Sequence, residues 1–143
     1  MRDYHIEQLT VFIENRPGEL AAITGLLEKE NISLLSIMLS DSSEFALLRL
    51  LTLETKRAKK ILLDRGFIAQ SSTVFGVKIE DRVGSFHHVV KTLQEKNINI
   101  RYTYTVNEKG AGIFIFKIDD DRFSEALLAL QDEDITLVNQ SQL

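Results

Sequence analysis

The residues best suited to hold a small ligand lie where an apolar strand pattern gives way to a helical one. Asn15, Arg16 and Gly18 stand at this junction. Backbone N–H groups without partners converge at the start of a helix and bind small anions and polar groups. Asn15 can accept a hydrogen bond from an ammonium group or donate one to a carboxylate. A plain strand-to-helix connection would use the same residues, because Pro17 and Gly18 both favour such a turn.

The junction occurs twice in the chain. Residues 13–20 return as residues 79–86, and Asn31-Ile32 returns as Asn97-Ile98 with the same offset of 66 residues. An internal repeat of this length indicates two copies of one small structural unit. We therefore expect a first domain at residues 1–72 and a second at residues 73–143.

The two junctions differ in the residues that would meet a ligand. Asp81 replaces Asn15, and its negative charge would repel a carboxylate while attracting an ammonium group. Val83 replaces Pro17, whose ring pre-sets the backbone for the helix. The first junction is therefore expected to dominate ligand binding.

The elements that position these junctions follow one order in both halves: strand, helix, strand, strand, helix, strand. The first half is expected to hold strands 6–13, 32–39, 45–53 and 67–72 and helices 18–30 and 56–64. The second half is expected to hold strands 75–79, 98–106, 111–118 and 135–138 and helices 85–95 and 123–130. Turns are expected at 41–44 and 107–110. This order predicts the α+β class, with two ferredoxin-like βαββαβ domains whose antiparallel sheets carry both helices on one face.

The third strand of each half is apolar on both of its faces. Residues 47–51 are interrupted by Arg49 alone, and residues 113–116 are entirely apolar. An antiparallel sheet with one face in water should instead alternate apolar and polar side chains. The pattern predicts that these sheets stack or join edges, and a homodimer is the expected assembly.

The composition argues against several other classes of function. There is no cysteine, which excludes disulfides, thiolate zinc sites and thiol catalysis and fits a reducing compartment. The net charge of −4 disfavours nucleic acid as a partner. The start has no signal-peptide pattern and no apolar run is long enough to span a membrane, so a cytoplasmic location is expected. His87 and His88 point about 100° apart on a helix and cannot easily bind one metal ion together. Neither a metal site nor a cofactor is expected.

The segment 14–20, followed by Ile23, Leu27 and Asn31-Ile32, resembles the ACT domain. The second copy is similar but weaker, and together the two copies cover nearly the whole chain. The resemblance implies a non-catalytic regulatory protein that binds a free amino acid between the strand–helix loop of one domain and the second strand of its neighbour. The binding residues that it implies are Asn15, Arg16, Pro17, Gly18, Glu19, Leu20, Leu35, Ser36, Ile37, Met38, Asp81, Val83, Gly84, Ser85 and Phe86.

Three interpretations of the function stay open at this point. In the first, the ligand shifts the relative orientation of ACT-like domains and a partner responds to it. In the second, the chain is a regulatory subunit of an amino-acid biosynthetic enzyme, similar to the small subunit of acetolactate synthase, or a tandem regulator of the glycine-cleavage repressor type. The third is an acylphosphatase-like hydrolase, which Arg16 suggests, although the longer glycine-bearing loop and second arginine of that family are absent.

Overall fold

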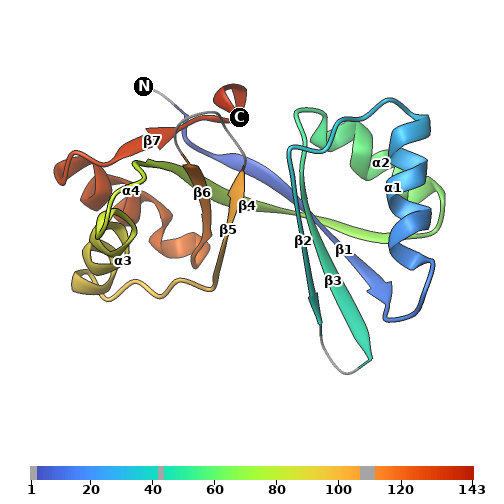
Figure 1. Cartoon of the computed structure of the whole chain (residues 1–143), viewed down its shortest axis with the longest axis horizontal. Coiled ribbons are helices and arrows are strands. Elements are labelled where there is room, and N and C mark those ends of the chain that lie inside the picture. The colour runs from blue at the N-terminus through green and yellow to red at the C-terminus, as the bar shows by residue number, and fades with distance from the viewer. Residues whose placement is uncertain (1–2, 42–43, 107–111) are drawn as a thin grey trace. The chain divides into compact units, whose positions relative to one another are not determined.

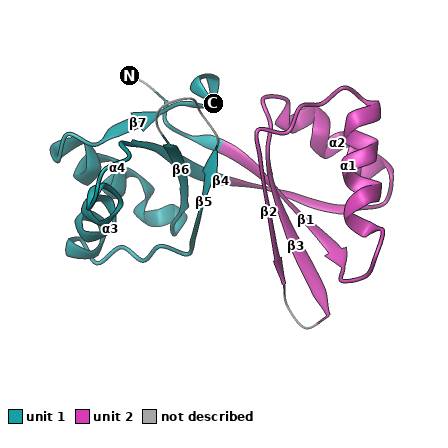
Figure 2. Cartoon of the chain, viewed as in Figure 1, with its two compact units in different colours: residues 1–6, 73–143 teal, residues 7–72 magenta. Residues whose placement is uncertain are grey.

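The computed structural model describes residues 3–41, 44–106 and 112–143 (Figure 1). The turn expected at 107–110 lies outside these residues, as do positions 42 and 43 of the turn expected at 41–44. The chain forms two compact units (Figure 2), of which unit 2 holds residues 7–72 and unit 1 holds residues 73–143 with the first residues up to Ile6. The units differ from the expected domains in these first residues, and the division into domains 1–72 and 73–143 stays a prediction.

Unit 2 has the strand order β2-β3-β1-β4. Its elements are β1 (Ile6–Glu14), α1 (Glu19–Lys29), β2 (Ser36–Asp41), β3 (Phe45–Leu51), α2 (Thr55–Asp64) and the first part of β4 (Ile68–Ile79). β3 pairs antiparallel with both β1 and β2, which places Leu48 opposite Val11 on one side and Leu39 on the other. Ile23 of α1 and Leu62 of α2 share one core with Val11 and Leu48, so both helices cover the same sheet face.

Unit 1 repeats this arrangement. β4 continues past residue 72, followed by α3 (Ser85–Glu95), β5 (Tyr102–Val106), β6 (Gly112–Lys117), α4 (Phe123–Asp132) and β7 (Thr136–Val138). β4 pairs antiparallel with β6 and β7, and β6 with β5, which gives the order β7-β4-β6-β5. Val89 of α3 and Leu130 of α4 share one core with Phe75 and Val77 of β4. The expected pair of ferredoxin-like α+β units is confirmed.

The chain start belongs to unit 1 through specific contacts. The ring of His5 stacks on that of Phe123, with ring centroids 4.5 Å apart, and Tyr4 packs against the same core. Two short 3-10 turns, η1 (Asp120–Arg122) and η2 (Gln140–Gln142), complete the described elements of this unit.

All four helices described here end in the same way. Each is followed by a residue with a positive φ: Asn31 at 58°, Gly66 at 84°, Asn97 at 57° and Asp134 at 57°. The N–H of the next residue then donates to a carbonyl in the last helical turn, as Ile32 does to Leu27 at 2.9 Å. This left-handed ending satisfies carbonyls that the helix leaves without partners.

The helices lie within two residues of their expected limits, whereas four strand predictions are wrong in their limits. The strands expected from residues 32 and 98 begin at Ser36 and Tyr102, because Asn31 and Asn97 close the preceding helices instead of opening strands. The strands expected at 67–72 and 75–79 are the single strand β4. Residues 71–74 contain neither glycine nor proline and have strand-forming Thr73 and Val74, so nothing interrupts the pairing.

The apolar second face of β6 is already buried in the single chain. Ile113 and Ile115, which lie on that face, are 1% and 0% exposed. Leu51 at the end of β3 is also buried. Leu47, on the same face of β3 as Leu51, is half-buried. The homodimer expected from these apolar strands stays a prediction.

Candidate functional site

The two loops share one backbone geometry that sets the start of α1 and of α3. Gly18 and Gly84 directly precede these helices with φ angles of 91° and 89°. Glycine adopts this left-handed conformation without the strain that a Cβ brings. The carbonyl of each glycine accepts the first helical hydrogen bond, from Ala22 and from His88, at 2.9 Å in both cases. The N–H of the first helical residue is bonded inside the loop, since Glu19 donates to the carbonyl of Arg16 at 3.5 Å and Ser85 to that of Arg82 at 3.1 Å. The N–H groups of the next two residues of each helix are the ones from which a ligand could accept.

Arg16 in the first loop is held by carboxylates of the same loop. Its guanidinium lies 2.9 Å from Glu19 and 3.1 Å from Glu14. The hydrogen bond that it donates to Glu19, followed by the charges of Glu14 and Glu19, raises the pKa of Arg16. The positive charge of Arg16 is thus compensated within the loop, so this side chain is poorly placed to bind a phosphate.

Asn15 also has a partner within its own unit. Its side-chain Nδ2 donates to Oδ1 of Asp41, at the last residue of β2, over 3.0 Å. Pro17 and Gly18 are exposed, while Leu20 is half-buried and packs against the core of unit 2.

Residues 35–38, which are expected to contact the ligand from a neighbouring domain, lie at the opposite end of β2 from Asp41. Leu35 precedes the strand, and Ser36, Ile37 and Met38 open it. Since β1 and β2 both run antiparallel to β3, their last residues lie at the same end of the sheet. The structure therefore does not bring residues 35–38 to the first loop of their own unit.

The second loop has fewer internal charge contacts than the first. Ser85 occupies the position of Glu19 in the repeat, and among the residues that the structure describes Arg82 has one ion pair, with Glu80 at 3.5 Å. The hydroxyl oxygen of Ser85 is buried and has no hydrogen-bond partner in the described part of the chain. Asp81 and Val83 are exposed. Phe86 is exposed as well, at 36%, although its ring packs beside Phe114 with centroids 5.0 Å apart.

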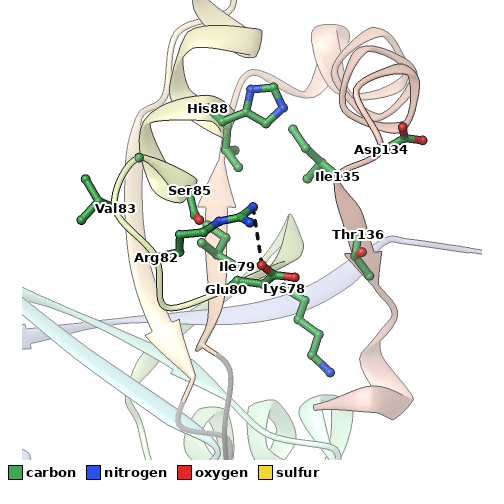
Figure 3. A pocket seen from close by; sticks show the side chains of 12 residues that line it. Lys78, Ile79, Glu80, Arg82, Val83, Ser85, His88, Asp134, Ile135 and Thr136 are labelled. Carbon is green, nitrogen blue, oxygen red and sulfur yellow. Dashed lines mark ion pairs between the residues drawn. The ribbon is translucent and has the colours of Figure 1, made fainter.

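A pocket of about 630 Å³ opens beside the second loop, within unit 1. Figure 3 shows Arg82 and Glu80 between the loop on one side and Ile135 and Thr136 on the other, with His88 above them. The lining residues are Lys78, Ile79, Glu80, Arg82, Val83, Gly84, Ser85, His88, Val89, Asp134, Ile135 and Thr136. His88 also lies 3.9 Å from Glu133 through Nε2.

Sequence reasoning found the loop but missed much of this pocket. Lys78 directly precedes the repeated segment 79–86, Glu80 lies within that segment but was not among the expected binding residues, and His88 lies one turn into the helix behind it. Residues 134–136 are some fifty positions downstream, and only strand pairing brings them near, since Thr136 lies opposite Lys78. A signal existed in the repeat, because the residues after the second helix of a βαββαβ unit must return beside its first strand.

The described residues offer neither a metal site nor a membrane-spanning helix. No cluster of three His, Asp or Glu side chains there is placed to hold a metal ion. No helix in the same part of the chain is long and apolar enough to cross a membrane.

Comparison with known proteins identifies the family. The family model of the ACT domain pair matches residues 4–143. The crystal structure of protein BT0572 from Bacteroides thetaiotaomicron superimposes with a TM-score of 0.89 at 24% identity, over 96% of this chain and 94% of that one. The ligand-free regulatory subunit of aspartate kinase from Thermus thermophilus gives a TM-score of 0.64 at 14% identity, over 91% and 93%. No curated protein gives a match. The match along nearly its whole length means that this chain belongs to the ACT domain pair family.

Proposed function

We propose that this chain is a non-catalytic regulatory protein that binds a free amino acid through its ACT domains. The observation that carries the proposal is the repeated strand–glycine–helix junction within a chain that matches the ACT domain pair over residues 4–143. The N–H groups at the start of a helix, together with its dipole, suit the carboxylate of an amino acid. Carboxylate side chains beside the same junction suit its ammonium group.

For the first loop, the proposed ligand lies between Asn15–Leu20 of one ACT domain and residues 35–38 of a facing domain. A second copy of the chain would supply that facing domain in a homodimer, since residues 35–38 lie away from the first loop of their own unit. A ligand that contacts two domains stabilises one of their relative orientations. Regulation then follows as a shift between populations of orientations.

A second candidate function is that of a regulatory subunit whose main role is to bind an amino-acid biosynthetic enzyme. The support is that regulatory subunits of aspartate kinase from Thermus thermophilus and Thermus flavus are matched over 93% of their own length. Their extent and fold are thus comparable to those of this chain. A hydrolase of the acylphosphatase type is not favoured, because the ion pairs of Arg16 with Glu14 and Glu19 compensate the charge that would hold a phosphate.

A thermal-unfolding screen of the purified chain against each of the twenty protein amino acids tests the first proposal. At least one should bind with a dissociation constant between about 1 μM and 1 mM. At a hundredfold excess over that constant, the ligand should stabilise the fold by about 2.7 kcal/mol. If no amino acid raises the unfolding temperature or gives heat in calorimetry, the proposal that this chain binds a free amino acid is wrong. A complex with a purified biosynthetic enzyme whose activity then changes would instead favour the subunit function.

A further inference from the structure

We propose that unit 1 has a separate site for an organic cation with an apolar body, in a pocket between the chain start and the outer face of α4. The pocket has a volume of about 660 Å³, within the usual range for small-molecule sites. It shares no described lining residue with the pocket beside the second loop, so the inference goes beyond the proposed function and does not depend on it. The lining residues are Asp3, Tyr4, His5, Ser124, Leu127, Leu128 and Gln131.

One wall of this pocket is a single face of α4. Its four lining residues have the helical spacing i, i+3, i+4 and i+7, from Ser124 to Gln131, and therefore share a face. Leu127 on this face is half-buried and packs against the core of unit 1, whereas Leu128 is 63% exposed. The wall thus offers two leucine side chains to a ligand.

The chain start forms the other wall. Tyr4 is half-buried and packs against the core of unit 1, and the ring of His5 stacks on Phe123 with centroids 4.5 Å apart. Since Phe123 is the first residue of α4, this stacking holds the chain start against the helix. The pocket is therefore built from two segments that lie far apart in the sequence.

The fold does not require apolar residues on this face of the helix. α2 is the equivalent helix of unit 2, and both helices bury residues of the same spacing, which are Thr55, Ala58 and Leu62 in α2 and Phe123, Ala126 and Leu130 in α4. Aligned in this way, Lys59 and Lys60 of α2 stand where α4 has Leu127 and Leu128. Because lysines suffice at these positions in α2, the two leucines of α4 need another explanation, and contact with an apolar ligand supplies it.

The cationic group of the ligand is inferred from Asp3. Among the described lining residues Asp3 has the one carboxylate, and there is neither lysine nor arginine. Both hydrogen bonds described for Asp3 involve Oδ1, which accepts from the backbone N–H of His5 at 2.9 Å and lies 2.6 Å from its Nδ1. Oδ2 is thus left to accept from an ammonium group. The bond from the backbone N–H of His5, followed by the bond with its side chain, lowers the pKa of Asp3, so this carboxylate stays charged at neutral pH.

These features together select one class of ligand. An ammonium group lies at Asp3, and an apolar body covers Leu127 and Leu128, which removes apolar surface from water. A free amino acid is disfavoured here, because Asp3 would repel its carboxylate. The ligand class therefore differs from the free amino acid proposed for the loops.

Nuclear magnetic resonance on the ¹⁵N-labelled full chain, with phenethylamine as the probe, tests the proposal. The titration is run at about pH 7.5, where histidine is usually neutral and a primary amine is charged. Phenethylamine should move the amide signals of Tyr4, Ser124 and Leu128, with a dissociation constant in the millimolar range or below. Phenethyl alcohol, which lacks the charge, should bind at least about threefold more weakly, and the anion hydrocinnamate more weakly still.

Matched variants test the two parts of the site. Asp3→Asn keeps the shape of the side chain and removes its charge, so it should weaken phenethylamine binding about threefold or more and leave phenethyl alcohol unaffected. Leu128→Lys places in α4 the residue that α2 has at this position, and it should also weaken phenethylamine about threefold or more. Asp132→Asn is the control, because it removes the same charge from α4 outside the lining. All three positions are exposed, so the variants should keep the dispersed amide spectrum of the wild type.

Several results would overturn the proposal. One is that phenethylamine moves none of these signals at millimolar concentration. Another is equal binding of phenethylamine and phenethyl alcohol, or equal effects of Asp3→Asn and Asp132→Asn, since Asp3 would then not bind the ammonium group. A third is movement of the Gly84 and Ser85 signals instead, which would place the amine at the second loop. A failed amino-acid screen would leave this site standing, because the two titrations report on different residues.

Discussion

Gly18 and Gly84 show how a single residue type sets the geometry of both loops. Their φ angles lie near +90°, and no atom lies within 4 Å of the position that a Cβ would occupy. The requirement for glycine is therefore conformational, because a side chain would meet open space. Any L-residue placed there must adopt a backbone conformation that its own Cβ makes unfavourable.

Replacement of Gly84 by alanine should accordingly lower the free energy of unfolding by about 1–2 kcal/mol. Gly25 provides a matched control, since it lies inside α1 with equal space around its Cβ position and no positive φ. Gly25→Ala should raise the free energy of unfolding by about 0.5–1 kcal/mol. Urea denaturation measures both changes. A loss of stability in both variants would show that space, and not conformation, is limiting.

The limits of sequence reasoning at the residue scale are clear in the choice between the loops. Asn15, Pro17 and Gly18 could be recognised, because their turn chemistry is local. The sequence favoured the first loop on the charge of Asp81 and on the replacement of Pro17 by Val83. It did not reveal that Arg16 is compensated by two carboxylates or that Asn15 donates to Asp41, twenty-six residues away. Such pairings depend on side-chain conformation and strand register, so the candidate site was only partly predictable.

At the scale of elements, helices were predicted better than strands for a physical reason. A helix is defined by local spacing of apolar residues, and Ile23 and Leu27 give that spacing directly. The start of a strand depends on where the neighbouring strand can form backbone hydrogen bonds with it, which local sequence does not reveal. Asn31 and Asn97 looked like the first residues of strands, yet their short polar side chains tolerate the left-handed conformation that ends a helix.

An arginine near the start of the second helix links the two helices of each unit. Arg57 donates to the carbonyl of Glu30 at 2.6 Å, just after α1 ends. Arg122 donates to the carbonyls of Lys96 and Asn97 at 2.8 and 3.2 Å, just after α3 ends. These carbonyls lack helical partners, and a cation also suits the negative end of the helix dipole.

Arg122→Ala and Arg57→Ala should therefore each lower the free energy of unfolding, and Arg122→Ala should lower it more, because it removes two hydrogen bonds to helix-end carbonyls instead of one. Lys60→Ala is the control, because the ion pair described for Lys60 is with Asp64 on the exposed surface of the same helix. That variant should change the free energy of unfolding by less than either arginine variant. Thermal unfolding compares the three proteins. Equal effects for Arg122 and Lys60 would mean that the contacts to the helix ends contribute nothing beyond surface charge.

Gly76 in β4 is needed for a different reason, the close approach of neighbouring side chains. A Cβ at this position would lie 2.7 Å from Cγ2 of Val138 in β7 and 3.1 Å from Cδ1 of Ile6. Gly76→Ala should lower the free energy of unfolding by about 1–3 kcal/mol through overpacking. The double variant Gly76→Ala with Val138→Ala should lose less than the sum of the two single changes, because one removes the clash made by the other. Additive losses in urea denaturation would contradict this account.

At the scale of the whole molecule, the question of assembly turns on the outer edge of unit 2. β2 stands at the end of the strand order and pairs only with β3 among the described strands. Ile37 and Leu39 on this strand are 44% and 49% exposed, and Phe45 at the start of β3 is 54% exposed. An edge strand that carries exposed apolar side chains is a template for pairing with another chain. We therefore expect a homodimer whose contact includes β2.

Leu39→Lys should convert that dimer to a monomer, because a charged side chain would be buried where the second copy packs. Leu128→Lys is the matched control, since Leu128 is 63% exposed on α4 of unit 1, away from this strand in the sequence and in a different unit. Light scattering at tens of micromolar should report a dimer for the wild type and for Leu128→Lys, and a monomer for Leu39→Lys. A monomeric wild type would contradict the assembly.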